Sequence, residues 1–134
     1  MIDVELTILN ILKTKLASEF SGLSVYGEEY VELPASFPSV TFEETGNSTY
    51  SQTKTSGGKV NHSIITYDID VYSNLRVGRK NQVKEIFEVI DNEMELLGFE
   101  KTFYERLPMG DNLSYRRKAK YTGLVSKDHI VYSF

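Results

Sequence analysis

The chain lacks cysteine and tryptophan altogether and has only three prolines in 134 residues. Without cysteine it can have no disulfide framework, no thiolate nucleophile and no thiolate metal site. No apolar run approaches the roughly 18 residues that a membrane span needs. The first residues carry acid where a secretory signal would carry base, and no small-residue cleavage site follows. We therefore expect a soluble chain that is cytoplasmic when it is synthesised.

An excess of basic residues is also missing. Lys and Arg number 15 against 19 Asp and Glu, which gives a formal net charge of -4. A protein whose main task is to grip nucleic acid is usually basic overall, because its affinity comes from neutralising phosphates. Mild acidity argues against that class. The chain has nine Tyr and seven Phe, and tyrosine suits half-buried strands, where the ring is covered and the hydroxyl stays in contact with water.

Two stretches have the periodicity of amphipathic helices. The first runs from Ile2 to about Phe20 and ends at Ser21-Gly22. The second runs from Gln82 to Leu97 and ends at Gly98, a position where helices commonly end in the left-handed backbone conformation that glycine adopts easily. The apolar stripes are Leu9, Leu12, Leu16 and Phe20 in the first helix, and Val83, Ile86, Phe87, Ile90, Met94 and Leu97 in the second.

The other apolar residues alternate with polar ones, as they do in strands with one covered face. In the clearest case Ile65, Tyr67, Ile69 and Val71 share one face, and Thr66, Asp68 and Asp70 share the other. Strands are expected at Leu23–Tyr26, Tyr30–Leu33, around Val40–Glu43, from Ser63, and at Phe99–Arg106, Leu113–Val125 and Ile130–Phe134. This order predicts one α+β domain over residues 1–134, with two helices packed on one face of a mostly antiparallel sheet.

One segment is purely polar apart from a single aromatic residue. Gly46 to Lys59 contains Tyr50 but no aliphatic side chain, so it cannot join a packed core unaided. Unstructured loops beyond about 12 residues are usually functional or disordered. We expect a flexible loop at about 46–59, either a mobile tip or an arm that becomes ordered on a partner.

Charged residues of opposite sign occupy two of the expected strands. Asp68 and Asp70 share one strand face, and Arg116, Lys118 and Lys120 share a face of the last long strand. Two carboxylates so placed can share a divalent cation, but such sites usually need further carboxylates. If the two strands are neighbours, ion pairs between them are the simplest use for both sets.

The sequence contains no recognisable catalytic set. His62 and His129 have no histidine partner at helical spacing and no nucleophile elbow, and Ser56-Gly57-Gly58-Lys59 lacks the spacing of a phosphate-binding loop. We expect no enzyme, no cofactor and no metal. Two other classes stay open as alternatives: a metal-dependent nuclease using Asp68 and Asp70, and a nucleic-acid-binding module using the basic strip Tyr115–Tyr121.

Several motifs together carry a resemblance to a known family. They are Pro38–Glu44, the polar loop after it, Tyr67–Asn74, the helix running to Leu96-Leu97-Gly98-Phe99, and Tyr115–Gly123. In these motifs and their order the chain resembles the small tail terminator, or tail-completion, proteins of long-tailed phages and phage-tail-like particles. The resemblance covers about residue 37 to the end, and it also implies a helix at the N-terminus.

The resemblance implies a structural protein that forms a ring, typically a hexamer. Such a ring caps the tail tube, stops its polymerisation and offers a surface to the head connector, with DNA only as passing cargo. Its expected partners are itself, the tail tube protein and a connector or neck protein, and its place is the virion tail after assembly in the host cytoplasm. Another neck protein, such as a head-completion or connector adaptor, is the nearest alternative.

A ring of this kind needs two different contact patches on each subunit. An acidic patch that meets a basic one gives register without chemistry, and an acidic lumen would let DNA slide without sticking. The candidate interface residues are Asp68, Asp70, Arg116, Lys118, Lys120, Tyr50, Lys54 and Lys59.

Overall fold

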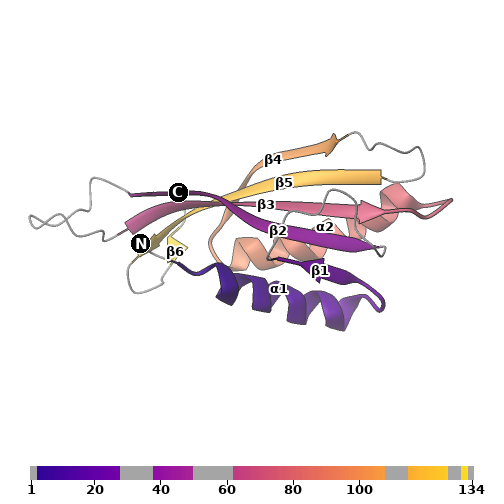
Figure 1. Ribbon diagram of the computed structural model, residues 1–134, viewed down its shortest axis with the longest axis horizontal. Coiled ribbons are helices and arrows are strands. Elements are labelled where there is room, and N and C mark those ends of the chain that lie inside the picture. Colours follow the sequence, from indigo (N-terminus) through magenta and orange to yellow (C-terminus); the bar gives the residue numbers. More distant parts are fainter. Residues whose placement is uncertain (1–2, 28–37, 50–61, 108–114, 127–130, 133–134) are drawn as a thin grey trace, which may run out of the picture.

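Both helices lie on the same side of a mostly antiparallel sheet (Figure 1). The computed structural model describes residues 3–27, 38–49, 62–107, 115–126 and 131–132. The helices are α1 (Glu5–Glu19) and α2 (Arg79–Leu96), and the strands are β1 (Ser24–Tyr26), β2 (Ser39–Thr49), β3 (His62–Ser73), β4 (Glu100–Leu107), β5 (Tyr115–Ser126) and β6 (Val131–Tyr132). The α+β class expected from the sequence is therefore confirmed.

The sheet has the order β1-β2-β3-β5-β4, so β5 lies between β3 and β4. Among the strand pairs of the described segments, only β1–β2 is parallel. β4 pairs with Arg116 to Thr122 of β5, and β6 pairs with Leu124 and Val125. Since β3 follows the other side of β5 along its full length, β4 and β6 share one edge of that strand.

Each helix buries most of the apolar stripe that its sequence predicts. α1 buries Ile8, Leu9, Leu12 and Leu16, and α2 buries Val83, Ile86, Phe87, Ile90 and Met94. Ile8 extends the predicted stripe, whereas Phe20 and Leu97 lie just beyond the helix ends and are only half-buried. These side chains meet the covered face of β3, where the four predicted apolar side chains are buried: Ile65, Tyr67, Ile69 and Val71. Neither helix is both long and apolar enough to cross a bilayer, as judged on the described parts of the chain.

The ends of the helices follow from local hydrogen bonds. At the start of α1 the Asp3 carboxylate accepts the Glu5 N–H at 3.1 Å. At the end of α2, Gly98 has a φ of 91°, and the Phe99 N–H donates to the Met94 carbonyl at 2.9 Å. This is the Schellman arrangement, which turns the chain from the helix into the next strand. α2 begins three residues earlier than expected, at Arg79, after Gly78 with a φ of 84°.

The polar loop begins later than the sequence predicts. β2 continues to Thr49, past a register shift between Glu44 and Gly46, and Thr49 is paired with Ser63. The prediction of a loop over residues 46–49 is therefore wrong. Hydrogen bonds to β3 satisfy the backbone there, so this part of the strand does not depend on apolar side chains. Residues 50–59 of the predicted loop lie outside the described residues, as do the strand expected at Tyr30–Leu33 and His129.

A glycine in β5 makes room for the ring that follows α2. A Cβ added at Gly123 would lie 2.7 Å from the nearest carbon of the buried Phe99 ring. Because that ring is held by the core, neither it nor the strand can move away cheaply. Gly123 is therefore required by packing, although its backbone conformation is an ordinary one.

We predict that Gly123→Ala lowers the free energy of unfolding by about 1–3 kcal/mol, because it overpacks the core. Chemical denaturation measures this directly. Gly46→Ala is the matched control, because its new Cβ would meet only atoms of Thr66, the nearest of them Cβ at an ordinary contact distance of 3.4 Å. A control change of less than about 1 kcal/mol is expected. Equal losses in both variants would contradict the role of the Phe99 contact.

Candidate functional site

The acidic and basic residues singled out in the sequence face one another on neighbouring strands. In the β3–β5 register Asp68 lies opposite Lys120, and Asp70 lies opposite Lys118. Tyr72 and Arg116 form the next pair of the same register. Their side chains alternate along the strands with the buried core residues, so they lie on the opposite sheet face, which no described helix covers (Figure 1). We call Asp68, Asp70, Arg116, Lys118 and Lys120 the charged ladder.

The strongest pair of the ladder is Asp70 with Arg116. The Arg116 Nε donates to Asp70 Oδ2 at 2.6 Å, and Arg116 Nη2 forms an ion pair with the same oxygen. The guanidinium also lies over the Tyr72 ring, 5.4 Å from its centre. Burial raises the pKa of the Asp70 carboxyl, and the positive charge of Arg116 opposes this rise without cancelling it. Asp70 therefore depends on Arg116 to carry its charge inside the protein.

Asp68 is held by two lysines and a hydroxyl. Lys120 Nζ lies 3.3 Å from both carboxylate oxygens, and Lys118 Nζ lies 3.4 Å from Oδ2. Lys118 also reaches Asp70 Oδ1 at 3.9 Å, so it links the two carboxylates. The Thr45 hydroxyl donates to Asp68 Oδ1 at 2.9 Å. All four carboxylate oxygens of the ladder thus have a cationic nitrogen within ion-pair distance.

The surface of the ladder is cationic rather than acidic. Asp68 and Asp70 are 7% and 4% exposed, whereas the Lys120 side chain is 39% exposed. An acidic lumen therefore does not follow from Asp68 and Asp70, because the basic side chains cover them. The hollow above the carboxylates has a volume of about 20 Å³, which is room for a single water.

This arrangement is that of a structural ion-pair network. A shared divalent cation would need the carboxylate oxygens that the basic side chains already occupy. Within the described residues no group of three or more acids and histidines could hold a metal ion. The sequence-based expectation of ion pairs across neighbouring strands is confirmed. Three other candidate residues, Tyr50, Lys54 and Lys59, lie outside the described residues.

We predict that Arg116→Gln lowers the free energy of unfolding by about 2 kcal/mol at neutral pH, because it leaves Asp70 buried without its main partner. The deficit should shrink as the pH falls, since a protonated Asp70 needs no cation. Adding Asp70→Asn should recover most of the loss. Chemical denaturation of the single and double variants at two pH values measures both effects.

The control is Lys13→Gln, which changes an exposed cation that forms no ion pair with any described residue. Its expected cost is within about 0.5 kcal/mol. If Arg116→Gln costs no more than this control, or if Asp70→Asn adds a further loss, then Asp70 does not depend on Arg116.

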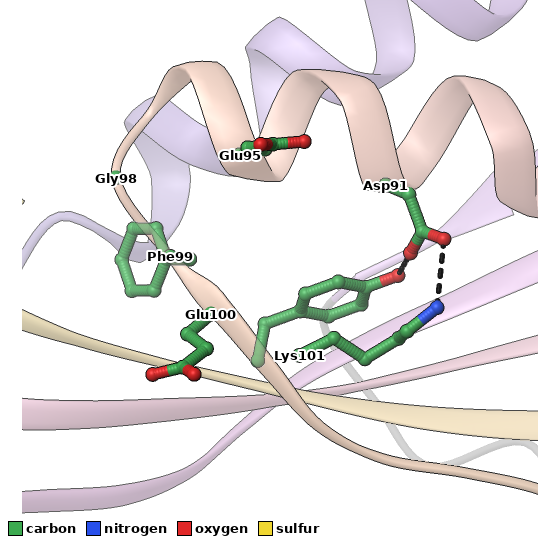
Figure 2. A pocket seen from close by; sticks show the side chains of 7 residues that line it. Asp91, Glu95, Gly98, Phe99, Glu100 and Lys101 are labelled. Carbon is green, nitrogen blue, oxygen red and sulfur yellow. Dashed lines mark hydrogen bonds and ion pairs between the residues drawn. The ribbon is translucent and has the colours of Figure 1, made fainter. Parts of the chain in front are cut away.

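A second polar site lies between the C-terminal half of α2, the start of β4 and the second half of β5 (Figure 2). Asp91 accepts a hydrogen bond from the Tyr121 hydroxyl, and it accepts another from Lys101 Nζ at 2.8 Å. Burial raises the pKa of Tyr121, and the Asp91 carboxylate raises it further. Tyr121 is therefore a neutral donor that joins the helix to the sheet.

Next to this contact is a cavity of about 360 Å³, which we call the α2–β4 cavity. Its lining includes the rings of Phe99 and Tyr121 and the carboxylates of Asp91, Glu95 and Glu100. Its volume is at the lower end of the range of ligand pockets. Sequence reasoning missed this site. The run of acids from Glu85 to Glu100 was a visible signal, but only the fold brings β5 beside it.

A third polar contact is buried under the sheet near the start of α1. Glu44 and Tyr67 are paired across β2 and β3. Glu44 Oε1 and the Tyr67 hydroxyl are both buried. Burial raises the pKa of Glu44, hydrogen bonds from the side chains of Asn47 and Tyr67 oppose the rise without cancelling it, and the negative charge of Asp3 adds to it. Burial likewise raises the pKa of Glu5, with Glu44 as the next cause.

This acid cluster gives a pH prediction with a definite sign. A carboxyl whose pKa is higher in the folded state makes folding more favourable as the pH falls, because the folded state binds the proton more tightly. Glu44→Gln should therefore raise the free energy of unfolding at neutral pH, and the gain should disappear as wild-type Glu44 is protonated. Thermal unfolding across pH 4 to 8 measures the difference, with exposed Glu85→Gln as control. A variant that is less stable than wild type at neutral pH contradicts the assignment.

A comparison with models of known protein families finds no match for this chain, and a comparison with curated proteins finds none either.

Proposed function

We propose that this chain is the subunit of a ring that caps the tail tube of a long-tailed phage or a tail-like particle. The ring stops polymerisation of the tube and provides the surface that joins the head. The observation that carries the proposal is the charged ladder, where every carboxylate is used in an ion pair inside the subunit. The charges of the β3–β5 strand pair therefore stabilise the fold of the subunit itself.

The fold supports the proposal as well. The resemblance implies an α+β domain with two helices and a mostly antiparallel sheet, and this is the observed architecture. One face of the sheet has no described helix over it (Figure 1), and it carries the partly exposed Lys120 together with the exposed carboxylates of Glu43 and Glu105, which the strand registers place beside the ladder. A polar, partly charged surface of this kind suits contacts between subunits that assemble in water.

The proposed partners follow from this role. They are further copies of the chain, the tail tube protein and a connector or neck protein, and DNA passes through the ring as cargo. The proposed place of the protein is the tail or neck of the finished particle. The nearest alternative, a head-completion or connector adaptor, differs in which partner it binds.

We predict that the purified protein, added in small amounts to polymerising tail tube protein, shortens the tubes and is found at one end of each. Electron microscopy measures tube length and shows the caps, and cosedimentation measures binding. The reason is that a capped end can add no further subunit.

Two results separate the possibilities. Unchanged tube lengths with binding to the head connector would favour the adaptor role. Unchanged tube lengths without binding to either partner would contradict the proposed function.

A further inference from the structure

We propose that α2 provides both halves of a head-to-tail contact between copies of this chain. The basic N-terminal end of α2 in one subunit would dock at the acidic α2–β4 cavity of the next. This inference rests on the proposed ring function and names the surface by which the subunits meet.

The charges of α2 and its flanks are sharply divided. From Leu75 to Lys84 there are four cations and no carboxylate, and from Glu85 to Glu100 there are six carboxylates and no cation. The cations are Arg76, Arg79, Lys80 and Lys84, and the acids are Glu85, Glu88, Asp91, Glu93, Glu95 and Glu100. The two ends of one helix therefore carry opposite charge.

This division opposes the helix dipole. A helix is stabilised by acids near its N-terminus and by cations near its C-terminus. α2 has no acid in its first turn and no cation in its last turn, and no side chain caps its start. Lys80, Lys84 and Glu95 form no ion pair with any described residue. The separation of charge along α2 adds no stability to a single subunit, so we infer that it acts between subunits.

The charges also share one side of the helix. Lys80, Lys84, Glu88, Asp91 and Glu95 follow one another at spacings of four, four, three and four residues. Such spacing places side chains in one row along a helix, beside the buried stripe. The acidic end of the row reaches the α2–β4 cavity, which Asp91 and Glu95 help to line.

The cavity has the chemistry to receive a long basic side chain. Figure 2 shows Glu95 of α2 and Glu100 of β4 on different sides of the space, with Phe99 beside them. Asp91 is already bonded to Tyr121 and Lys101, so Glu95 and Glu100 are the acids left for an incoming cation. The aromatic rings suit the methylene stem of a lysine, and the two carboxylates suit its ammonium group.

Exposed apolar side chains accompany the charges at both ends. Val77 is 88% exposed and Leu75 is 41% exposed at the basic end, and Leu96 is 81% exposed at the acidic end. Single exposed apolar residues are common on protein surfaces. Here they lie beside charges of opposite sign at the two ends, where contact between two copies would cover both kinds of side chain.

A second copy fits this surface better than an unrelated partner does. The two patches are complementary to each other, and they lie at different places on the same subunit. A contact between different patches is heterologous, and it closes into a ring when the rotation between subunits allows. Complementary charges at both ends also favour one orientation of the neighbour over others.

The test is a charge swap measured by sedimentation of the full chain. Lys80→Glu/Lys84→Glu removes the net positive charge of the basic end, because Arg76 and Arg79 are then balanced by two acids, and Glu95→Lys/Glu100→Lys reverses the two acids that are left for an incoming cation. Each double variant should associate roughly tenfold or more weakly than wild type. The quadruple variant exchanges the charges of the contacting residues and should associate again, as should a mixture of the two double variants. High salt should weaken association of the wild type.

Folding is not a confounding factor for the basic end. Placing acids in the first turns of α2 agrees with the helix dipole, so Lys80→Glu/Lys84→Glu should melt at the wild-type temperature or above it. The control is Lys13→Glu, which reverses the charge of an exposed lysine of α1 that forms no ion pair with any described residue, and it should leave association unchanged.

The outcomes distinguish this inference from the function it rests on. If both double variants still form rings of the same size as the wild type, the α2 contact is overturned and the capping role is unaffected. A wild-type chain that stays monomeric at high concentration would also overturn the α2 contact. If that monomeric chain has no effect on tube length either, the capping role is overturned too. Failure of the quadruple variant to associate would show that the charges do not pair with each other.

Discussion

The rest of the structure depends on the pairing of β3 with β5. This register places Asp68 and Asp70 opposite lysines on one face, and it keeps Ile65, Tyr67 and Ile69 against the helices on the other. Because side chains alternate along a strand, a shift of one residue would exchange the two faces. Carboxylates would then enter the apolar core without partners, which is far more costly than leaving them in ion pairs. The charged ladder and the core thus specify the same register.

Much of this arrangement could be predicted from the sequence, because it depends on local periodicity. The alternation from Ile65 to Val71 predicted which face of β3 is buried, and the stripe of α2 predicted its core side chains. The pairing of Asp68 and Asp70 with Lys118 and Lys120 could be predicted only on the condition that the two strands are neighbours, and no local sequence pattern shows that they are. β3 and β5 are neighbours because the sheet topology inserts β5 between β3 and β4.

The errors have physical causes of the same kind. β2 runs to Thr49 because β3 supplies hydrogen bonds to a polar segment that has no strand pattern of its own. The contact between Asp91 and Tyr121 joins residues 30 positions apart, and the pairing of Glu44 with Tyr67 joins two strands. The alternating pattern marked Asp68 and Asp70 as facing away from the core, but it did not show that the side chains of β5 would cover them.

The charges of the subunit therefore fall into two groups with different uses. Those of the ladder are satisfied inside the sheet, where they maintain register. Those of α2 are divided between its ends against the preference of the helix, and in our proposal the neighbouring subunit satisfies them. A ring subunit needs both uses, because its own fold must be rigid while its contacts remain open until assembly.

The most direct test of this account is the mass of the purified protein in solution, measured by native mass spectrometry over a range of concentrations. The account predicts one closed oligomer whose mass is a whole multiple of the 15.3 kDa chain and which stays the same size as the concentration rises. A monomer at every concentration would contradict it, and so would a ladder of species that keeps growing, because an open series of contacts cannot cap a tube.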